Sequence, residues 1–294
     1  MTENIKQNKV ILGCGDIGQR IVKELVSRGD SPDLISGFVN SRASELKLKD
    51  LGINAYVFDA DNLAGDLSMC AEADVYYTIA PQKSGLNDLR SAAIIKAFKR
   101  NAIRPNKLVL ISTTGLYGDC GGDWVTEESP IKPQTERGQR RLDSERQWLS
   151  WGAECNVGVV ILRVPGIYAR SRLPRARLQK GTPVVKASEC GFSNRVHADD
   201  LANMCVEAML KATNGEIYNA SDGQPGKIPE YLQAAAESLG LPALAEISML
   251  QAQSELSSGM LSYLNESRKI SNEKILSDLA IELRYPDFKV GILN

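Results

Sequence analysis

The stretch Gly13-Cys14-Gly15-Asp16-Ile17-Gly18 decides the fold of this 294-residue chain. It follows a short apolar run at 10–12 and precedes apolar residues at helical spacing, which are Ile17, Ile21, Val22, Leu25 and Val26. This pattern predicts a strand, a tight turn and a helix. Gly13 permits the sharp bend, Gly15 lets another group approach the backbone, and Gly18 lets the helix pack close to the strand.

A glycine turn in this context is typical of dinucleotide binding, because the N-terminus of the following helix faces an anion. We therefore expect NAD or NADP to bind here, with Gly13, Gly15, Asp16, Ile17 and Gly18 as cofactor-binding residues and the pyrophosphate close to Gly15. An NAD site usually has an acidic residue about 20 residues further on, at the end of the second strand.

The chain has Asn40-Ser41-Arg42 at that place instead of an acidic residue. A guanidinium with a hydroxyl nearby suits the 2′-phosphate of NADP, so the sequence favours NADP, with NAD as the alternative. Arg42 could equally be a solvated residue in the first turn of a helix.

Two further segments are expected in the cofactor site. Asp59 ends the third predicted strand, where its carboxylate would accept a hydrogen bond from adenine or would cap the next helix. Both interpretations stay open. Ala80 and Pro81, which follow the strand predicted at 75–79, complete the expected cofactor site.

Strands and helices alternate through the first half of the chain, which predicts an α/β fold with a doubly wound parallel sheet of the Rossmann type. The predicted strands are 10–12, 34–39, 55–58, 75–79, 108–111 and 157–162, and helices are predicted at 41–51, 89–98 and 142–151. The residues 115–133 form a long connection, and such loops are often functional.

Beyond Pro165 the alternation loosens, with a helix predicted at 198–211, a strand at 217–220 and a helix at 229–239. We divide the chain into a NAD(P)-binding domain, 1–165, and a smaller C-terminal substrate lobe, 166–294. We expect the lobe to be packed on the first domain and partly interleaved with it.

The composition argues against several classes of protein. With 35 basic and 36 acidic side chains, the net charge of −1 gives no electrostatic case for nucleic acid or an anionic membrane. The six cysteines form no Cys-x-x-Cys pair and His197 is the only histidine, so no metal site is expected. The sequence shows neither a signal-peptide pattern nor an apolar run of about 20 residues, and we expect a cytoplasmic protein.

Three further segments form recognisable motifs in addition to the glycine turn: Ser112 to Gly118, Arg163 to Tyr168, and Arg195 to Leu201. Together they resemble the extended short-chain dehydrogenase/reductase superfamily, in its epimerase/dehydratase branch. The stretch Pro133 to Gly138, followed by Glu145, resembles an atypical YeeZ-type group. The resemblance implies a sugar nucleotide or a small carbonyl or alcohol as substrate, and it leaves a homodimer as an option.

In that superfamily a serine or threonine binds the substrate oxygen, and the resemblance places Thr113 in this role. The usual Tyr-x-x-x-Lys pair is missing, because Arg137 and Arg141 stand at the matching offsets. An arginine cannot shuttle a proton at neutral pH, since its pKa exceeds about 12. Glu136 and Tyr117 remain as candidate proton donors, although Tyr117 normally packs structurally in relatives.

Two hypotheses about function follow. The first is an oxidoreductase or epimerase with an unusual proton donor, and the second is a non-catalytic NADP-binding sensor. The resemblance also implies that His197 braces the site while Asp199 or Asp200 caps the next helix. The cationic residues Arg170, Arg172, Arg175 and Arg177 could pair with a diphosphate or form a solvated face.

Overall fold

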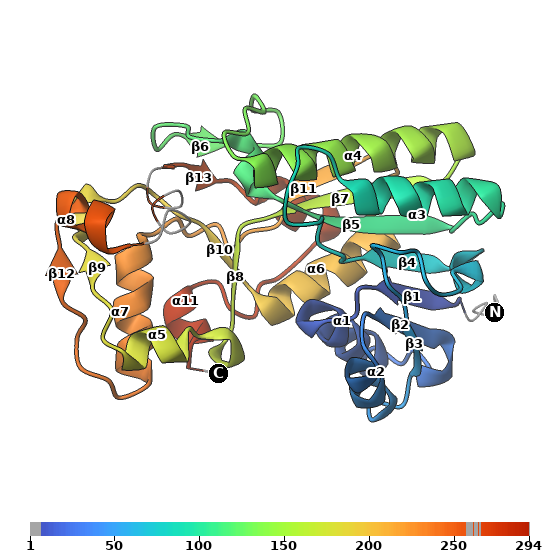
Figure 1. Ribbon diagram of the computed structural model, residues 1–294, viewed down its shortest axis with the longest axis horizontal. Helices are drawn as coiled ribbons and strands as arrows, with labels where there is room; N and C mark the ends of the chain where they lie inside the picture. The colour runs from blue at the N-terminus through green and yellow to red at the C-terminus, as the bar shows by residue number, and fades with distance from the viewer. Residues whose placement is uncertain (1–6, 257–260, 262–263, 265, 294) are drawn as a thin grey trace.

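The computed structural model describes residues 7–256, 261, 264 and 266–293. Its centre is a parallel sheet of seven strands in the order β11-β7-β5-β4-β1-β2-β3 (Figure 1). The strands are β1 (Lys9–Leu12), β2 (Ile35–Val39), β3 (Asn54–Val57), β4 (Asp74–Tyr77), β5 (Lys107–Thr113), β7 (Gly158–Val164) and β11 (Ile217–Asn219). The predicted fold class, a doubly wound parallel sheet, is confirmed.

Helices cover both faces of the sheet, as Figure 1 shows. One face carries α3 (Leu89–Arg100) and α4 (Glu136–Cys155), and the other carries α1 (Asp16–Ser27), α2 (Arg42–Lys49) and α6 (Ala198–Lys211). Helix α10 (Glu273–Leu279) lies on the same side as α6, because Ile275 and Leu279 belong to the core that α1, α2 and α6 share. Neighbouring residues of β5 alternate between the two cores, since Val109 packs on one side and Leu110 on the other. A strand buried on both faces is apolar along most of its length, as the sequence of β5 is.

Helix α4 begins six residues before the predicted start at 142. Thr135 caps it, because its hydroxyl oxygen accepts a hydrogen bond from the Gly138 N–H at 3.1 Å. The polar residues Glu136 to Arg141 gave no apolar period in the sequence and are nevertheless helical. Arg137 and Arg141 therefore lie one turn apart on the same helix.

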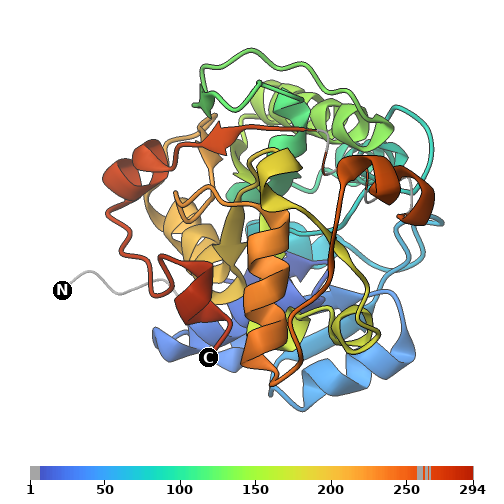
Figure 2. The same cartoon turned by 90° about the vertical axis from the view of Figure 1, so that its left-hand side faces the viewer.

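The rest of the described chain forms a smaller layered part, which faces the viewer in Figure 2. Three short parallel pairs join distant segments: β8 (Gly166–Tyr168) with β10 (Arg195–His197), β9 (Val184–Val185) with β12 (Glu246–Ile247), and β6 (Trp124–Val125) with β13 (Lys269–Ile270). The described helices of this smaller part are α5 (Arg175–Gln179), α7 (Ile228–Ser238), α8 (Met249–Glu255) and α11 (Phe288–Gly291). Tyr168, Leu232, Leu244 and Phe288 belong to a separate core there.

Short 3-10 turns complete the described elements. They are η1 (Pro32–Leu34), η2 (Ser68–Cys70), η3 (Thr114–Tyr117), η4 (Arg170–Arg172) and η5 (Ala187–Glu189). The predicted loop 115–133 thus contains most of η3 and all of β6. Strand β11 and helix α6 follow residue 165 in the chain, yet both belong to the layers of the central sheet. The division into 1–165 and 166–294 stays a proposal.

Candidate functional site

The glycine turn forms one wall of a cavity of about 380 Å³ at the carboxyl ends of β1, β2, β3 and β4. We call it the glycine-turn cavity. Its lining comprises Gly13, Cys14, Gly15, Gln19, Phe38, Val39, Asn40, Ser44, Lys47, Phe58, Asp59, Ala60, Asp61, Thr78, Ile79, Ala80 and Arg90. Ligands of open parallel sheets bind outside the carboxyl ends of the strands, and this cavity lies there.

The three glycines have different surroundings. Gly13 has a φ of +93°, and a Cβ there would lie 2.9 Å from the Ile79 nitrogen. A Cβ on Gly15 would meet only one atom within 4 Å, the Gly13 oxygen at 3.9 Å, so the space over Gly15 is open. A Cβ on Gly18 would lie 2.9 Å from Ile11, which shows how closely α1 packs on β1.

The N-terminus of α1 fits an anionic group. Among the described residues no side chain caps this helix, because Gly15 stands at the N-cap position. The first-turn N–H groups, which include those of Asp16 and Ile17, therefore have no side-chain acceptor. An uncapped helix N-terminus beside an open glycine suits a diphosphate.

Other expected cofactor residues are distributed around this cavity. Asn40, Asp59 and Ala80 line it, whereas Ser41, Arg42 and Pro81 are not among the described residues that do. Ser41 caps α2, where its hydroxyl oxygen accepts from the Ser44 N–H at 3.3 Å. The side chain of Arg42 is 72% exposed and pairs with Glu45.

Ser44 and Lys47 line the glycine-turn cavity and were missed in the sequence. They stand three residues apart on α2, so both side chains lie on the face of the helix that meets the cavity. That spacing was the available signal. Asp59 caps the segment after β3: its carboxylate accepts from the Asn62 amide at 2.7 Å and from the Asp61 N–H at 2.8 Å. These hydrogen bonds, that from Asn62 first, hold the pKa of Asp59 below its usual value.

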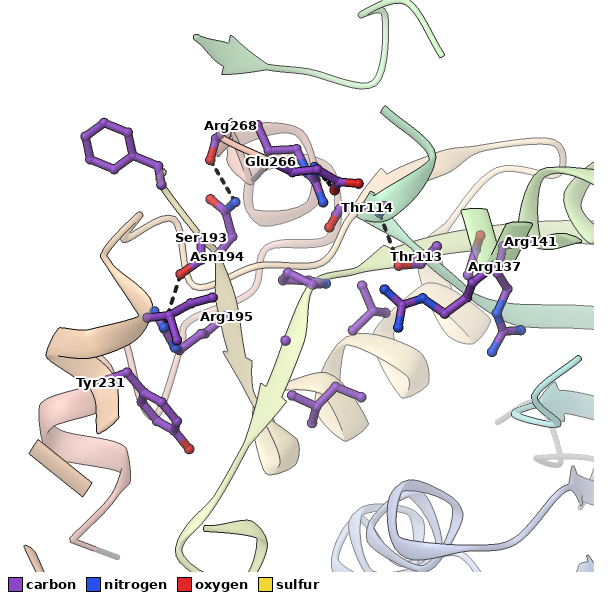
Figure 3. A pocket seen from close by; sticks show the side chains of 18 of the residues that line it. Thr113, Thr114, Arg137, Arg141, Ser193, Asn194, Arg195, Tyr231, Glu266 and Arg268 are labelled. Carbon is purple, nitrogen blue, oxygen red and sulfur yellow. Dashed lines mark hydrogen bonds and ion pairs between the residues drawn. The ribbon is translucent and has the colours of Figure 1, made fainter. Parts of the chain in front are cut away.

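A second cavity, of about 480 Å³, lies at the carboxyl ends of β5 and β7 (Figure 3). We call it the arginine cavity, because five arginines and one acidic residue contribute to its lining: Arg137, Arg141, Arg177, Arg195, Arg268 and Glu266. Apolar side chains include Ile111, Val164, Ile167 and Leu232. Glu266 pairs with Arg268 at 2.6 Å, so the cavity keeps a surplus of positive charge.

Thr113 ends β5 and lines the arginine cavity. Its hydroxyl oxygen accepts from the Gly115 N–H at 3.1 Å, which fixes the side chain at the start of η3. The hydroxyl hydrogen can still donate to a ligand oxygen in the cavity. The role that the resemblance implies for Thr113, binding the substrate oxygen, stays a prediction.

Arg141 is hydrogen-bonded to one lining residue of each cavity. Its Nη1 donates to the Ile111 carbonyl at 3.0 Å and to the Ile79 carbonyl at 3.4 Å. Ile111 lines the arginine cavity, whereas Ile79 lines the glycine-turn cavity. In Figure 3 the Arg137 side chain points from α4 into the arginine cavity, toward the side where Thr113 lies.

The two candidate proton donors lie elsewhere, and neither is among the described residues that line the arginine cavity. The side chain of Glu136 is 65% exposed and pairs with Arg140 at 3.4 Å. Tyr117 is only 1% exposed. Its hydroxyl donates to Asn219 and accepts from Arg163, both at 2.9 Å, and burial raises its pKa.

A buried network lies behind Thr113. Arg163 of β7 donates to both carboxylate oxygens of Glu145 on α4, at 2.9 and 3.3 Å. Ser112 of β5 donates to the same carboxylate at 2.5 Å. Because the Arg163 and Glu145 side chains are each 3% exposed, this ion pair joins β5, β7 and α4 inside the protein.

His197 is itself the cap of α6, and this corrects the expectation that Asp199 or Asp200 has that role. The His197 Nδ1 accepts from the Asp199 N–H at 3.2 Å, and Asp200 instead accepts the N–H groups of Arg284 and Tyr285, each at 2.9 Å. Burial lowers the pKa of His197 to about 4, so the ring is neutral at pH 7. This arrangement suits a bracing role.

The arginines after β8 have separate partners. Arg172 pairs with Asp16 of α1 at 2.8 Å, and Ser171 accepts from Arg20 at 2.9 Å, so this segment is tied to the first turns of α1. Arg170 donates to the Ile292 carbonyl at 3.3 Å. Arg177 is the member of the group that lines the arginine cavity.

The described residues contain neither a candidate metal site nor a candidate membrane-spanning helix. In the ranges 7–256 and 266–293, together with residues 261 and 264, no three His, Cys, Asp or Glu side chains group in a way that could hold a metal ion. Within the same part of the chain, no helix has the length and apolar character needed to cross a membrane.

Comparison with solved structures gives matches along nearly the whole chain. A conserved protein of unknown function from Silicibacter pomeroyi is 25% identical, with a TM-score of 0.84 and coverage of 97% of this chain and 96% of that chain. UDP-glucuronic acid 4-epimerase from Bacillus cereus in complex with NAD is 17% identical, with a TM-score of 0.75 and coverage of 98% and 94%. The dTDP-glucose 4,6-dehydratase from Bacillus anthracis, also in complex with NAD, is likewise 17% identical, with a TM-score of 0.75 and coverage of 98% of this chain and 94% of that chain.

A search of curated proteins gives no match. The model of the NAD dependent epimerase/dehydratase family matches residues 11–221, which include the glycine turn, Thr113 and the first turns of α4. This match covers well over half of the chain. The chain therefore belongs to the NAD-dependent epimerase/dehydratase family.

Proposed function

We propose that the protein binds NADP in the glycine-turn cavity and acts as an oxidoreductase or epimerase on a carbonyl or alcohol group in the arginine cavity. The observation that carries this proposal is the position of Arg141, which is hydrogen-bonded to the lining of both cavities. A dinucleotide with its diphosphate at α1 and its nicotinamide near Thr113 would cross from one cavity to the other at this arginine.

The proposed preference for NADP over NAD rests on the side of the glycine-turn cavity that α2 forms. Asn40, Ser44 and Lys47 line it with two hydrogen-bonding side chains and one positive charge. These groups suit a 2′-phosphate, and Arg42 stands in the preceding turn with its guanidinium paired to Glu45. Comparing the dissociation constants of NADP and NAD for wild type and Lys47→Met tests this choice. A wild type that prefers NAD would contradict it.

A nucleotide sugar is the substrate class we propose first, with a small carbonyl compound or alcohol as the second. The surplus of arginines in the arginine cavity supports an anionic substrate, because guanidinium groups bind phosphates in a bidentate manner. Thr113 would donate its hydroxyl hydrogen to the reacting oxygen and so orient the reacting carbon. The bound nicotinamide supplies the donor or acceptor of hydride.

The proton step requires a group other than the usual tyrosine. The position of Tyr117 and Glu136 outside the lining of the arginine cavity makes a water molecule the proposed proton carrier. The positive charges of Arg137 and Arg141 would stabilise an alkoxide as it forms on the substrate oxygen. Such a site would work more slowly than one with a positioned acid, since general acid catalysis is typically worth about 10² to 10⁴ in rate.

The test is cofactor turnover with a panel of sugar nucleotides and small carbonyl compounds. Wild type is expected to oxidise or reduce the cofactor with at least one compound, and Thr113→Val should lower that rate by about tenfold or more. Thr126→Val is a matched control, because Thr126 is not among the residues that line either cavity. Absence of turnover with every compound would count against an enzyme.

The arginines on α4 also favour a second candidate, a non-catalytic NADP-binding sensor. Arg141, which donates to two backbone carbonyls, stands at the offset where related enzymes have a lysine, and Arg137 stands at the offset of the tyrosine. A sensor would bind NADP without hydride transfer and would change its surface. Limited proteolysis with and without NADP tests this, and an identical digestion pattern would contradict it. A homodimer remains an option for either candidate.

A further inference from the structure

Arg90, on the first turn of α3, joins two segments that lie apart in the sheet. Its Nη1 donates to the Ala80 carbonyl, after β4, at 2.8 Å. Its Nε and Nη2 donate to the two carboxylate oxygens of Asp61, after β3, at 2.6 and 2.7 Å. Strands β1 and β2 lie between β4 and β3 in the sheet. Because Ala80, Asp61 and Arg90 all line the glycine-turn cavity, these hydrogen bonds connect two parts of its lining.

The guanidinium of Arg90 is held in one orientation. Each of its three nitrogens donates to a protein oxygen, and the two bonds to Asp61 are the parallel pair that a guanidinium makes with a carboxylate. The backbone at Arg90 is fixed as well, since the fully buried carboxylate of Asp88 accepts its N–H at 3.1 Å. The Arg90 side chain is nevertheless 26% exposed, so part of the fixed guanidinium remains accessible to a ligand.

The pairing with Asp61 decides which kind of ligand suits Arg90. The hydrogen bond from Arg90 holds the pKa of Asp61 below its usual value, so both groups are charged at neutral pH and balance each other. A phosphate would compete with the carboxylate for the same N–H donors. The faces of the guanidinium plane carry no such competitor, and guanidinium planes stack on flat aromatic rings and on nucleic-acid bases. Arg90 therefore suits a flat ring better than an anion.

The proposed position of the dinucleotide leaves this part of the cavity for its base. The diphosphate at Gly15 and the 2′-phosphate at Lys47 account for the lining that α1 and α2 contribute. The remaining lining comes from the segments after β3 and β4 and from Arg90, and it includes the apolar side chains of Phe58 and Ile79. Apolar groups together with a fixed planar cation suit a base, which is flat and uncharged.

We infer that the guanidinium of Arg90 is the platform on which the adenine ring of the cofactor stacks, with Asp61 and Ala80 holding its plane. This inference rests on the proposed binding of NADP in the glycine-turn cavity and adds a residue that contacts the base. A stacked adenine meets Arg90 through its face, so Arg90 does not read the groups at the edge of the base. Stacking of one base on a planar side chain typically changes affinity by about tenfold or more.

Fluorescence titration of the full chain with NADPH and with its hypoxanthine analogue tests the platform. Hypoxanthine keeps the flat ring system of adenine and changes the groups at its edge. Arg90→Ala should weaken the binding of both dinucleotides by the same factor, about tenfold or more. A side chain that hydrogen-bonds to the edge of the base would give two different factors.

Arg90→Lys separates the planar group from the positive charge. A lysine can still pair with Asp61, but it has no flat group, so this variant should lose as much affinity as Arg90→Ala. Arg100→Ala, an exposed position at the other end of α3, should bind both dinucleotides as wild type does. Thermal unfolding of each variant gives the temperature below which the affinities of folded chains are compared.

The contrary results have distinct meanings. An Arg90→Lys variant that binds NADPH as tightly as wild type would overturn the platform, because a positive charge alone would then be sufficient. Wild-type affinity in Arg90→Ala, or unequal factors for the two dinucleotides, would also overturn it, while the proposed cofactor site stands. Should wild type bind neither dinucleotide, both the inference and the proposed cofactor fail.

Discussion

At the scale of single residues, an added methyl group is expected to affect stability strongly at Gly13 and weakly at Gly15. Gly13→Ala places a side chain at a φ of +93° and against the Ile79 backbone, so we expect a loss of more than about 2 kcal/mol in the free energy of unfolding. Gly15→Ala has open space, so we expect a change within about 1 kcal/mol.

The same substitution at Gly15 should lower the affinity for the dinucleotide by at least tenfold, because the methyl group occupies the approach to the first turn of α1. Chemical denaturation and fluorescence titration with NADPH measure the two effects separately. A Gly15→Ala variant with unchanged affinity would show that the cofactor is bound elsewhere.

Tyr117 gives a second prediction at this scale. Tyr117→Phe removes a buried hydroxyl that bonds with Arg163 and Asn219, so the free energy of unfolding should fall by about 1 to 3 kcal/mol. Turnover, measured below the unfolding transition, should change less than threefold, because the hydroxyl has two internal partners and does not line the arginine cavity. A loss of turnover with unchanged stability would make Tyr117 the proton donor.

Residues were predictable from the sequence where their role depends on local structure. The glycines follow from a strand and a helix that are adjacent in the chain, and Thr113 follows from its place in a recognisable motif. Lys47 could not be predicted, because its place in the lining of the glycine-turn cavity depends on how α2 packs beside β2. Arg42 stands out in the sequence, yet in the structure it pairs with Glu45 on its own helix.

At the scale of elements, the Glu145 to Arg163 ion pair predicts a large effect from one truncation. Glu145→Ala leaves the guanidinium of Arg163 buried without its carboxylate, which should cost about 3 to 5 kcal/mol of the free energy of unfolding. Glu154→Ala, on the exposed end of the same helix, is the control and should cost less than about 1 kcal/mol. Urea denaturation measures both, and similar values would contradict the structural role of the buried pair.

Element boundaries show what periodicity can predict. The spacing of apolar residues predicts a helix at 198–211, and α6 has the same bounds in the structure, because that helix is buried along most of its length. For α4 the apolar period starts only at Leu142, since the preceding turns face the cavity and solvent, and only the Thr135 cap indicates the true start. Strand β11 was predicted as a strand, whereas its pairing with β7 depends on contacts between segments about 55 residues apart.

At the scale of the whole molecule, stability should depend on pH through Asp222. Burial raises the pKa of this carboxyl from 3.8 to about 7, so the folded state binds more protons than the unfolded state between these values. Stability contributed by Asp222 is therefore lost as the pH rises from about 4 to 7. His197 acts in the opposite direction, since its lowered pKa makes the folded state less stable as the pH falls from 6.5 to about 4.

Comparing wild type with Asp222→Asn isolates the first effect, because His197 is the same in both. The variant should gain about 2 to 3 kcal/mol relative to wild type when the pH is raised from 5 to 8. Urea denaturation at the two pH values measures this difference, with the exposed Asp33→Asn as a control. An equal effect of Asp222→Asn at both pH values would mean that the carboxyl is already ionised at pH 5.

Arg141 is hydrogen-bonded to the lining of both cavities, and one measurement tests directly whether a dinucleotide extends from one to the other. It is the crystal structure of the complex with NADP. In this complex we expect the 2′-phosphate beside Asn40, Ser44 and Lys47, and the diphosphate at Gly15 and the first turn of α1. Nicotinamide C4 should lie within reach of a substrate bound to Thr113. A nicotinamide bound away from Arg141 and Thr113, or an arginine cavity closed by Arg137, would contradict it.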